Sequence, residues 1–305
     1  MMETREWALV TYTILSQMAV GSFLVLGAVH FLAQRKAGEA EADRLSDRAL
    51  LAIGPVLVLG VLASLLHLGN PANAYRAIAN IGSSWLSREI FFTMAFTGVG
   101  FVFAIMQWRK LATPAIRNAV AVLAALIGVV AVYSMSHIYM LANQPTWNSA
   151  ATPLSFFCTT LLLGSLAIGV ALSANYTYLK SRKSAALDVQ ANLLRDALRW
   201  IAVAAIVVLG FELVVISASL IDFGSGDAAA SLVNIAEDYN TLFILRISLV
   251  FLGAGVFAFF LYRTASVLGQ ERVLFALVYG AFALVLIAEV MGRYLFYASH
   301  IKIGF

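Results

Sequence analysis

Long stretches of apolar residues alternate with short polar segments along the whole chain. Each stretch is apolar on all sides over about 20 residues or more, the length that an α-helix needs to cross the hydrocarbon core of a bilayer. A membrane β-strand would instead show a two-residue alternation. The pattern therefore predicts eight transmembrane helices, over residues 7–33, 49–68, 89–108, 115–141, 154–180, 197–221, 241–267 and 272–297.

No long polar linker or low-complexity tract interrupts these stretches, so we expect residues 1–305 to form a single integral membrane domain. The first stretch is long enough to span the membrane, and it lacks the basic region and cleavage pattern of a signal peptide. The expected fold class is all-α, a polytopic bundle of eight transmembrane helices.

The composition agrees with a membrane protein. Hydrophobic residues make up 62% of the 305 residues and charged residues only 12%, whereas a soluble domain is roughly half apolar and about a quarter charged. These proportions argue against a nucleic-acid binder, a secreted disulfide scaffold and a disordered regulator. The single cysteine, Cys158, allows no internal disulfide and no cysteine-ligated zinc or iron–sulfur site.

The basic residues fall mainly on one side of the predicted bundle, which explains the net charge of +4 without a polyanionic partner. Fourteen lysines and arginines lie in the segments 34–48, 109–117, 180–199 and 263–272, all on that side. The opposite side holds Arg5, Arg76, Arg88, Arg293 and Lys302, with Arg246 just inside a helix. Because cytoplasmic loops carry the excess of Lys and Arg, we expect both termini to face away from the cytoplasm.

The segment between the second and third helices is the richest in groups that can carry chemistry. It contains His67, Asn70, Pro71, Tyr75, Arg76, Ser87 and Glu89. Asn70 is suited to cap a short interfacial helix over about 71–80, and we expect Ser87 to cap the third helix with Glu89 in its first turn. His67 and Glu89 would then lie at the outer ends of consecutive helices, which are usually neighbours.

A histidine and a carboxylate on either side of a slot suit a quinol, whose two hydroxyl protons must leave as its electrons depart. Structural explanations also exist for both residues. The helix dipole favours an acidic residue in a first turn, and Glu89 can pair with Arg76 or Arg88. A histidine at a helix end, such as His67, is often only interfacial.

The run from His67 to Glu89 contains Asn-Ala-Tyr-Arg and Gly-Ser-Ser-Trp-Leu-Ser-Arg-Glu. It resembles the membrane-anchor subunit of bacterial dimethyl sulfoxide reductase, a family related to the polysulfide reductase membrane subunits. The eight spans, the outward termini and a last helix that ends with residues 289–300 fit the same family. In that family a helix-2 histidine and a helix-3 acidic residue are implicated in quinol binding, and these match His67 and Glu89.

The resemblance implies a multi-pass subunit of the bacterial inner membrane with periplasmic termini and no haem or metal of its own. Such a subunit oxidises menaquinol near the outer face and is not the terminal catalytic subunit. Its partners would be a four-cluster iron–sulfur subunit and a molybdopterin catalytic subunit, both docked on the outer face. The segments 69–88, 142–153 and 222–240 are the expected docking surface.

The remaining polar positions have a functional and a structural interpretation each. His137 and Tyr139, near the outer end of the fourth helix, can line the same quinol pocket. Glu289 and Arg293 share one helix face, and Glu212 can pair with Arg246 across helices, because an unpaired charge in hydrocarbon is costly. We expect these four residues to form intramembrane ion pairs, with a proton path as the alternative. His30, near the inner face, is expected to be interfacial.

Two other functions remain open from the residues alone. A b-type cytochrome would use His67 and His137 as axial ligands. A secondary transporter would need broken helices and charges at the midplane, and Glu212 is the main feature in its favour.

Overall fold

The computed structural model describes residues 4–65, 78–141, 144, 146–184, 186–223, 238–267 and 269–298. The first helices are α1 (Thr4–Ala37), α2 (Glu39–Leu65), α3 (Trp85–Trp108) and α4 (Pro114–His137). They are followed by α5 (Ala151–Ser181) and α6 (Leu187–Phe223). The next span has three continuous parts, α8 (Asn240–Val250), the π-helix η3 (Phe251–Phe257) and α9 (Ala258–Ala265), and α10 (Glu271–Ala298) is the last helix.

Eight helical segments in these ranges are long and apolar enough to cross a membrane, which confirms the predicted number and order. Several helices extend beyond the predicted spans at their polar ends. Helix α2 begins at residue 39 rather than 49, and α6 begins at residue 187 rather than 197. The added turns carry charged side chains, so hydropathy alone marks the hydrocarbon-spanning part and misses the ends.

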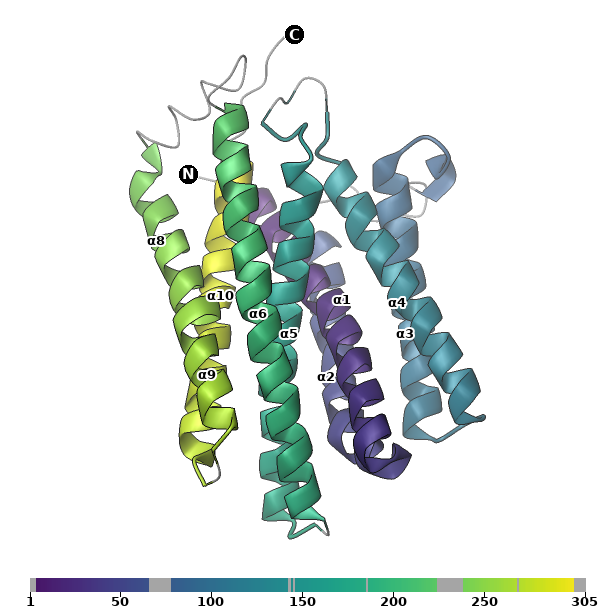
Figure 1. Cartoon of the computed structure of the whole chain (residues 1–305). Helices are drawn as coiled ribbons and strands as arrows, with labels where there is room; N and C mark the ends of the chain where they lie inside the picture. Colours follow the sequence, from purple (N-terminus) through teal and green to yellow (C-terminus); the bar gives the residue numbers. More distant parts are fainter. Residues whose placement is uncertain are drawn as a thin grey trace.

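The helices lie side by side along one common direction, with α1 in the interior of the bundle (Figure 1). Helix α1 packs against both α2 and α5, whereas α3 packs mainly against α4. In the apolar part of α1, 72% of the residues are buried, compared with 17% in α3. Helix α1 is therefore the central element, and α3 is largely exposed to the surrounding lipid.

Two glycines allow α1 and α5 to approach closely. A Cβ atom added to Gly21 on α1 would overlap the carbonyl group of Thr160, and one added to Gly164 on α5 would overlap the backbone at Gly21. Small residues permit such backbone contact between membrane helices, where packing replaces the hydrophobic effect as a source of association.

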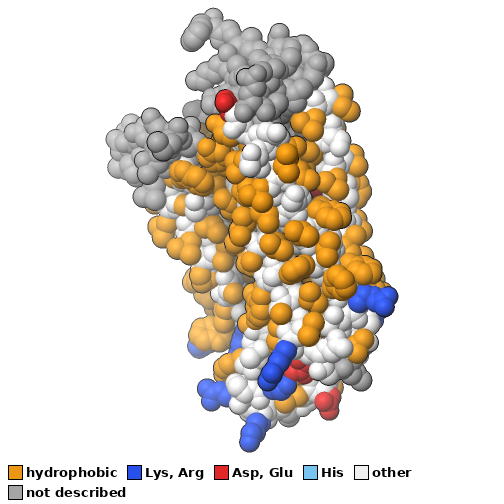
Figure 2. All heavy atoms as spheres, turned by 90° about the vertical axis from the view of Figure 1, so that its left-hand side faces the viewer, with side chains coloured by type: hydrophobic (Ala, Val, Ile, Leu, Met, Phe, Trp, Pro, Cys, Tyr) orange, Lys and Arg blue, Asp and Glu red, His pale blue; other side chains and the backbone are white. Residues whose placement is uncertain are grey.

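The two ends of the bundle differ in charge. Helix α1 begins and α10 ends at the same end (Figure 1), which we call the terminal end. The opposite end, the basic end, holds Arg35, Lys36, Arg44, Arg48, Arg109, Lys110, Arg117, Lys180, Arg182, Lys183, Arg195, Arg199, Arg263 and Arg272. Figure 2 shows apolar side chains covering the middle of one face and basic side chains gathered at one end.

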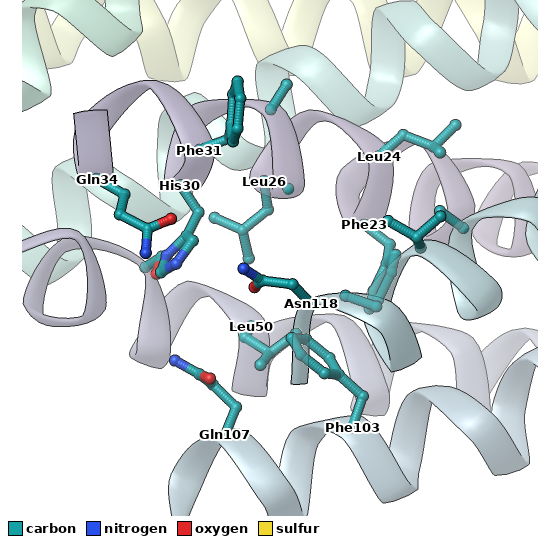
Figure 3. Close-up of a pocket in the computed structure, with 16 residues that line it drawn as sticks. Phe23, Leu24, Leu26, His30, Phe31, Gln34, Leu50, Phe103, Gln107 and Asn118 are labelled. Carbon is teal, nitrogen blue, oxygen red and sulfur yellow. The ribbon is translucent and has the colours of Figure 1, made fainter. Parts of the chain in front are cut away.

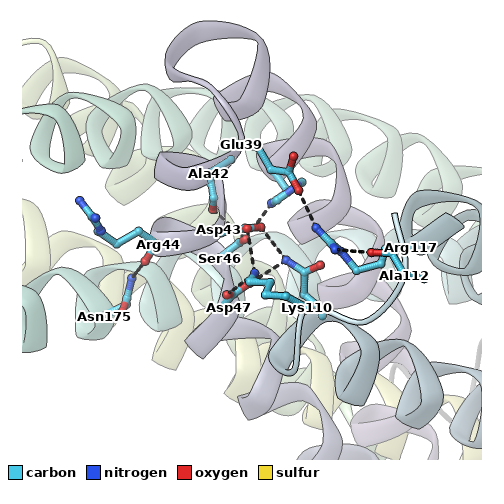
Figure 4. Close-up of polar contacts among 12 residues, drawn as sticks. Glu39, Ala42, Asp43, Arg44, Ser46, Asp47, Lys110, Ala112, Arg117 and Asn175 are labelled. Carbon is cyan, nitrogen blue, oxygen red and sulfur yellow. Dashed lines mark hydrogen bonds and ion pairs between the residues drawn. The ribbon is translucent and has the colours of Figure 1, made fainter. Parts of the chain in front are cut away.

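Ion pairs connect α2 with α4 and with the turn between α3 and α4 at the basic end (Figure 4). Arg117 donates to Glu39 at 2.5 Å. Lys110 lies 2.8 Å from both Asp43 and Asp47. These contacts bridge helices that otherwise share few direct contacts, so they hold the α3–α4 hairpin against the rest of the bundle.

Replacing Gly21 with alanine should lower the free energy of unfolding by about 1–3 kcal/mol, because the added methyl group forces α1 and α5 apart. Gly98→Ala is the matched control, since a Cβ at Gly98 meets nothing within 4 Å. Thermal unfolding of the two variants in detergent micelles would measure the difference. Equal stability of both variants would contradict the proposed importance of this contact.

Candidate functional site

Three of the predicted quinol-binding residues, His67, Tyr75 and Arg76, lie outside the described residues. The same is true of most of the expected interfacial helix over 71–80. At the terminal end, α1, α3, α4, α5 and α10 carry or surround the remaining quinol-binding candidates.

Helix α3 begins with a serine cap, but at a different serine from the one predicted. Ser84 has extended backbone angles (φ −111°, ψ 126°), and its side chain accepts a hydrogen bond from the Ser87 N–H at 3.4 Å. The prediction that Ser87 caps α3 is wrong, because the helix already begins at Trp85. Ser87 is instead buried in the first turn, and Glu89 falls in the second turn.

The side chain of Glu89 is buried against α1, with only 4% of the residue exposed. Tyr12 of α1 lies within hydrogen-bonding reach of this carboxyl group. The Tyr12 hydroxyl also shares a 3.4 Å hydrogen bond with Thr93, which is one helical turn from Glu89 on the same face of α3. Glu89 thus faces the interior of the bundle near the terminal end, in a setting of hydroxyl groups.

Arg88 does not neutralise Glu89. Its guanidinium donates to the carbonyl oxygens of Ile81 at 2.9 Å and Gly82 at 2.7 Å, and it lies 4.3 Å from the ring centre of Trp85. Among the described lysines and arginines, none forms an ion pair with Glu89. Within that part of the chain, the pairing with Arg88 that would explain Glu89 structurally is not formed.

Tyr139 and Tyr297 bring two further hydroxyl groups to the same region. Their hydroxyl oxygens are 2.7 Å apart, and both residues interact electrostatically with Glu89. Tyr139 packs edge-on against Trp147 and Phe296, with ring centres 5.5 Å and 5.3 Å away. Burial raises the pKa of Tyr139 well above its ordinary value, and the neighbouring Tyr297 raises it further. The phenol of Tyr139 therefore keeps its proton and can donate it in a hydrogen bond.

His137 turns toward its own helix. Its Nδ1 lies 2.8 Å from the carbonyl oxygen of Tyr133, and its ring centre lies 3.9 Å from that of Tyr133 and 4.7 Å from that of Trp85. The structure thus places Tyr139 near Glu89, whereas His137 packs against the first turn of α3.

Deeper in the bundle, Glu289 and Arg293 bind other partners than each other. Glu289 accepts a hydrogen bond from Thr159 at 2.6 Å. Arg293 donates to Gln17 of α1 at 3.0 Å, and its guanidinium carbon lies 3.7 Å from the ring centre of Phe156. The described contacts include no direct ion pair between the two charges.

Glu212 of α6 and Arg246 of α8 form an ion pair at 2.6 Å. Only 3% of the Glu212 side chain and 14% of the Arg246 side chain are exposed. The Arg246 guanidinium lies directly against Gly292, where any larger residue would collide with it. All four charged residues line one cavity of about 120 Å³, and the Glu212 carboxyl group lies within hydrogen-bonding reach of Glu289.

Several residues of this region escaped the sequence analysis. Tyr12, Thr13, Ser16 and Gln17 are buried polar residues on α1. Their spacing of four, from Tyr12 to Ser16 and from Thr13 to Gln17, marks a polar stripe on an otherwise apolar helix, and this signal could have identified them. In the described ranges, no group of three or more His, Cys, Asp or Glu side chains is arranged to hold a metal ion.

Comparison with known proteins gives matches along nearly the whole chain. The family described as DMSO reductase anchor subunit (DmsC) matches residues 1–299. The chain is 30% identical over 300 residues to the anaerobic dimethyl sulfoxide reductase protein YnfH of Escherichia coli (strain K12), covering 98% of this chain and 96% of the relative. It is 31% identical over 301 residues to a second anaerobic dimethyl sulfoxide reductase polypeptide of the same organism, with the same coverage. The resemblance seen in the sequence is confirmed.

Replacing Arg246 with methionine should lower the free energy of unfolding by about 3–5 kcal/mol, because it leaves the Glu212 carboxylate buried without its partner. Adding Glu212→Gln to this variant should restore most of the loss. Denaturant unfolding in mixed micelles would measure both, with Arg272→Met at the exposed basic end as the control. If the single variant were as stable as the control, the pair would have no structural role.

Proposed function

The chain belongs to the family of dimethyl sulfoxide reductase anchor subunits, and on this premise we propose that it oxidises menaquinol near its terminal end and passes the electrons to an iron–sulfur subunit. Membership makes it the membrane anchor of a dimethyl sulfoxide reductase complex in the bacterial inner membrane. Catalytic and iron–sulfur subunits are its partners in such a complex.

The observation that carries the proposal is the buried carboxyl group of Glu89, which forms no described ion pair. Burying an ionisable side chain within the membrane-spanning bundle costs free energy, so its presence there points to a function. It can accept a hydrogen bond from one quinol hydroxyl and then its proton, acting as a general base. The Tyr12 hydroxyl is within reach to hydrogen-bond the carboxyl group. The Tyr139 hydroxyl, which interacts electrostatically with Glu89, is a candidate to orient the quinol head group.

His67 is the proposed acceptor for the second hydroxyl proton, as the match to the helix-2 histidine of the family implies. Tyr75 and Arg76 follow it along the chain and complete the proposed binding segment. Ser87 is buried in the first turn of α3, two residues before Glu89. His137 packs on Trp85 at the start of α3, so its proposed role is to support that end of the pocket.

The charge asymmetry of the bundle supports an orientation with the basic end in the cytoplasm and the terminal end in the periplasm. The partner subunits, with four iron–sulfur clusters and the molybdopterin, would then dock on the terminal end. The segment 222–240 includes Asp222 and Asp238 and contains no lysine or arginine. This negative charge favours a basic patch on the partner. Protons and electrons would leave the quinol on the same side, so the reaction would move no net charge across the membrane.

Glu89→Gln should reduce quinol-supported reduction by the assembled complex at least about hundredfold, because the amide cannot accept a proton. Reduction driven by an artificial soluble electron donor should stay unchanged, since that donor bypasses the quinol site. Glu271→Gln is the matched control, a carboxylate in the first turn of α10 at the basic end. Normal quinol turnover in the Glu89 variant would remove this residue from the mechanism.

The orientation can be tested with single cysteines in a Cys158→Ser background. Asn148→Cys at the terminal end and Lys183→Cys at the basic end are both accessible positions. In intact spheroplasts that produce the anchor without its partners, a membrane-impermeant maleimide should label the first variant, and the second only after lysis. The reverse labelling pattern would overturn the proposed orientation.

A further inference from the structure

A second pocket lies in the half of the bundle nearer the basic end, between α1 and α2 on one side and α3 and α4 on the other (Figure 3). Its volume is about 470 Å³, within the range of small-molecule sites in proteins. Figure 3 shows His30, Gln34, Gln107 and Asn118 toward one end of it, and Phe23 and Phe103 toward the other. We call it the inner pocket.

The hydrogen bonds of His30 define which ring nitrogen is available to a ligand. Its Nδ1 lies 2.8 Å from the Ser46 hydroxyl oxygen, and that hydroxyl donates its single proton to the carbonyl oxygen of Ala42 at 2.9 Å. The bond between them is therefore one in which His30 Nδ1–H donates to Ser46. The neutral imidazole keeps a lone pair on Nε2, which is an acceptor.

Gln107 also presents a hydrogen-bond acceptor to the inner pocket. Its amide nitrogen donates to Asp43 at 2.6 Å and to Asp47 at 2.9 Å, so both amide hydrogens are used. The side-chain oxygen of this buried residue remains as an acceptor. The inner pocket thus offers two acceptors at its polar end, which hydroxyl or N–H donors of a ligand would satisfy. The side-chain amides of Gln34 and Asn118 also line it and can donate or accept.

The charges around the inner pocket disfavour an anionic head group. No lysine or arginine is among the described residues that line it. Beyond its polar end, Lys110 is bound by Asp43 and Asp47 and Arg117 by Glu39. The Arg35 guanidinium lies 4.3 Å from the ring centre of Phe31 at the edge of the pocket. A phosphate finds no cation among the lining residues, and a quinone carbonyl, which only accepts, gains no hydrogen bond from His30 Nε2 or the Gln107 side-chain oxygen.

The inner pocket is open to lipid and separate from Glu89. Gly27 and Phe31 on α1 line it and are exposed on the apolar surface of the bundle, as is Val122 on α4. Tyr12, beside Glu89, precedes His30 by 18 residues on α1, which at 1.5 Å per residue is about 27 Å along the helix. One quinol head group cannot occupy both places.

We propose that the inner pocket binds a second lipid-soluble hydroquinone, whose hydroxyl groups donate to His30 Nε2 and to the side-chain oxygen of Gln107 while its ring packs among Phe23, Phe31 and Phe103. The fit is to the reduced, dihydroxy form. This inference rests on the proposed function, because the inner pocket would hold the same class of reductant that the outer site consumes. The inner pocket only binds the hydroquinone, since it is remote from the proton acceptor Glu89.

The test measures binding of 1,4-dihydroxynaphthalene to the full-length protein in phosphatidylcholine nanodiscs by anaerobic equilibrium dialysis. The unmodified protein should bind two molecules and Glu89→Gln one. Adding Gly27→Leu should abolish the remaining binding, because a Cβ at Gly27 meets nothing within 4 Å and the longer side chain extends into the pocket. Gly98→Leu, equally unobstructed but away from the inner pocket, should keep it.

A second pair of variants distinguishes the loss of the Gln107 acceptor from a general folding defect. In the Glu89→Gln background, Gln107→Leu should weaken the remaining binding about tenfold. Gln190→Leu removes another buried glutamine that donates to a carboxylate, Glu41, outside the inner pocket, and should leave binding unchanged.

Three results would overturn the inner site: retained binding in Gly27→Leu, equal competition by 1,4-naphthoquinone, or displacement by phosphatidylglycerol added to the nanodiscs. The last result would identify the pocket as a phospholipid site. Failure of the outer site is distinguishable, because Glu89→Gln would then bind as many molecules as the unmodified protein, while the comparison of Gly27→Leu with Gly98→Leu would still test the inner pocket.

Discussion

The free-energy cost of a charge in hydrocarbon governs the whole arrangement of this bundle. It confines fourteen lysines and arginines to one end, where ion pairs such as Arg117 with Glu39 tie neighbouring helices together. It also explains why the charges within the helices are paired or hydrogen-bonded, as Glu212 is with Arg246. The buried carboxyl group of Glu89, near the terminal end and hydrogen-bonded to a hydroxyl group rather than paired with a described cation, is the one that we connect with proton transfer.

Helix α1 contributes residues to both proposed binding sites. Its first turns bring Tyr12 to Glu89, its middle carries Gln17 to Arg293, and its far end contributes His30 to the inner pocket. The close contact of Gly21 with Gly164 fixes its position against α5 between these points. One central helix therefore sets the spacing between the outer carboxyl group and the inner pocket.

Hydropathy predicted the eight spans correctly, because the length of an apolar segment is a local property of the chain. It missed the added turns of α2 and α6, whose charged residues are stabilised by partners distant in sequence. The cap of α3 was assigned to Ser87 rather than Ser84, since serines three positions apart suit the same role. Glu89 was found from its residue type and position. Tyr12 was missed because hydroxyl and amide side chains do not interrupt an apolar stretch, so the polar stripe that it shares with Ser16 and Gln17 went unnoticed. The inner pocket depends on how two helix pairs diverge, which no single segment encodes.

The concentration of positive charge at one end has a consequence for the membrane itself. Each lysine or arginine near a bilayer surface attracts acidic headgroups by about 1 kcal/mol, and many of those at the basic end are exposed. The leaflet that meets this end will gather an annulus of acidic phospholipid around the protein, so the chain shapes the lipid composition of its own surroundings.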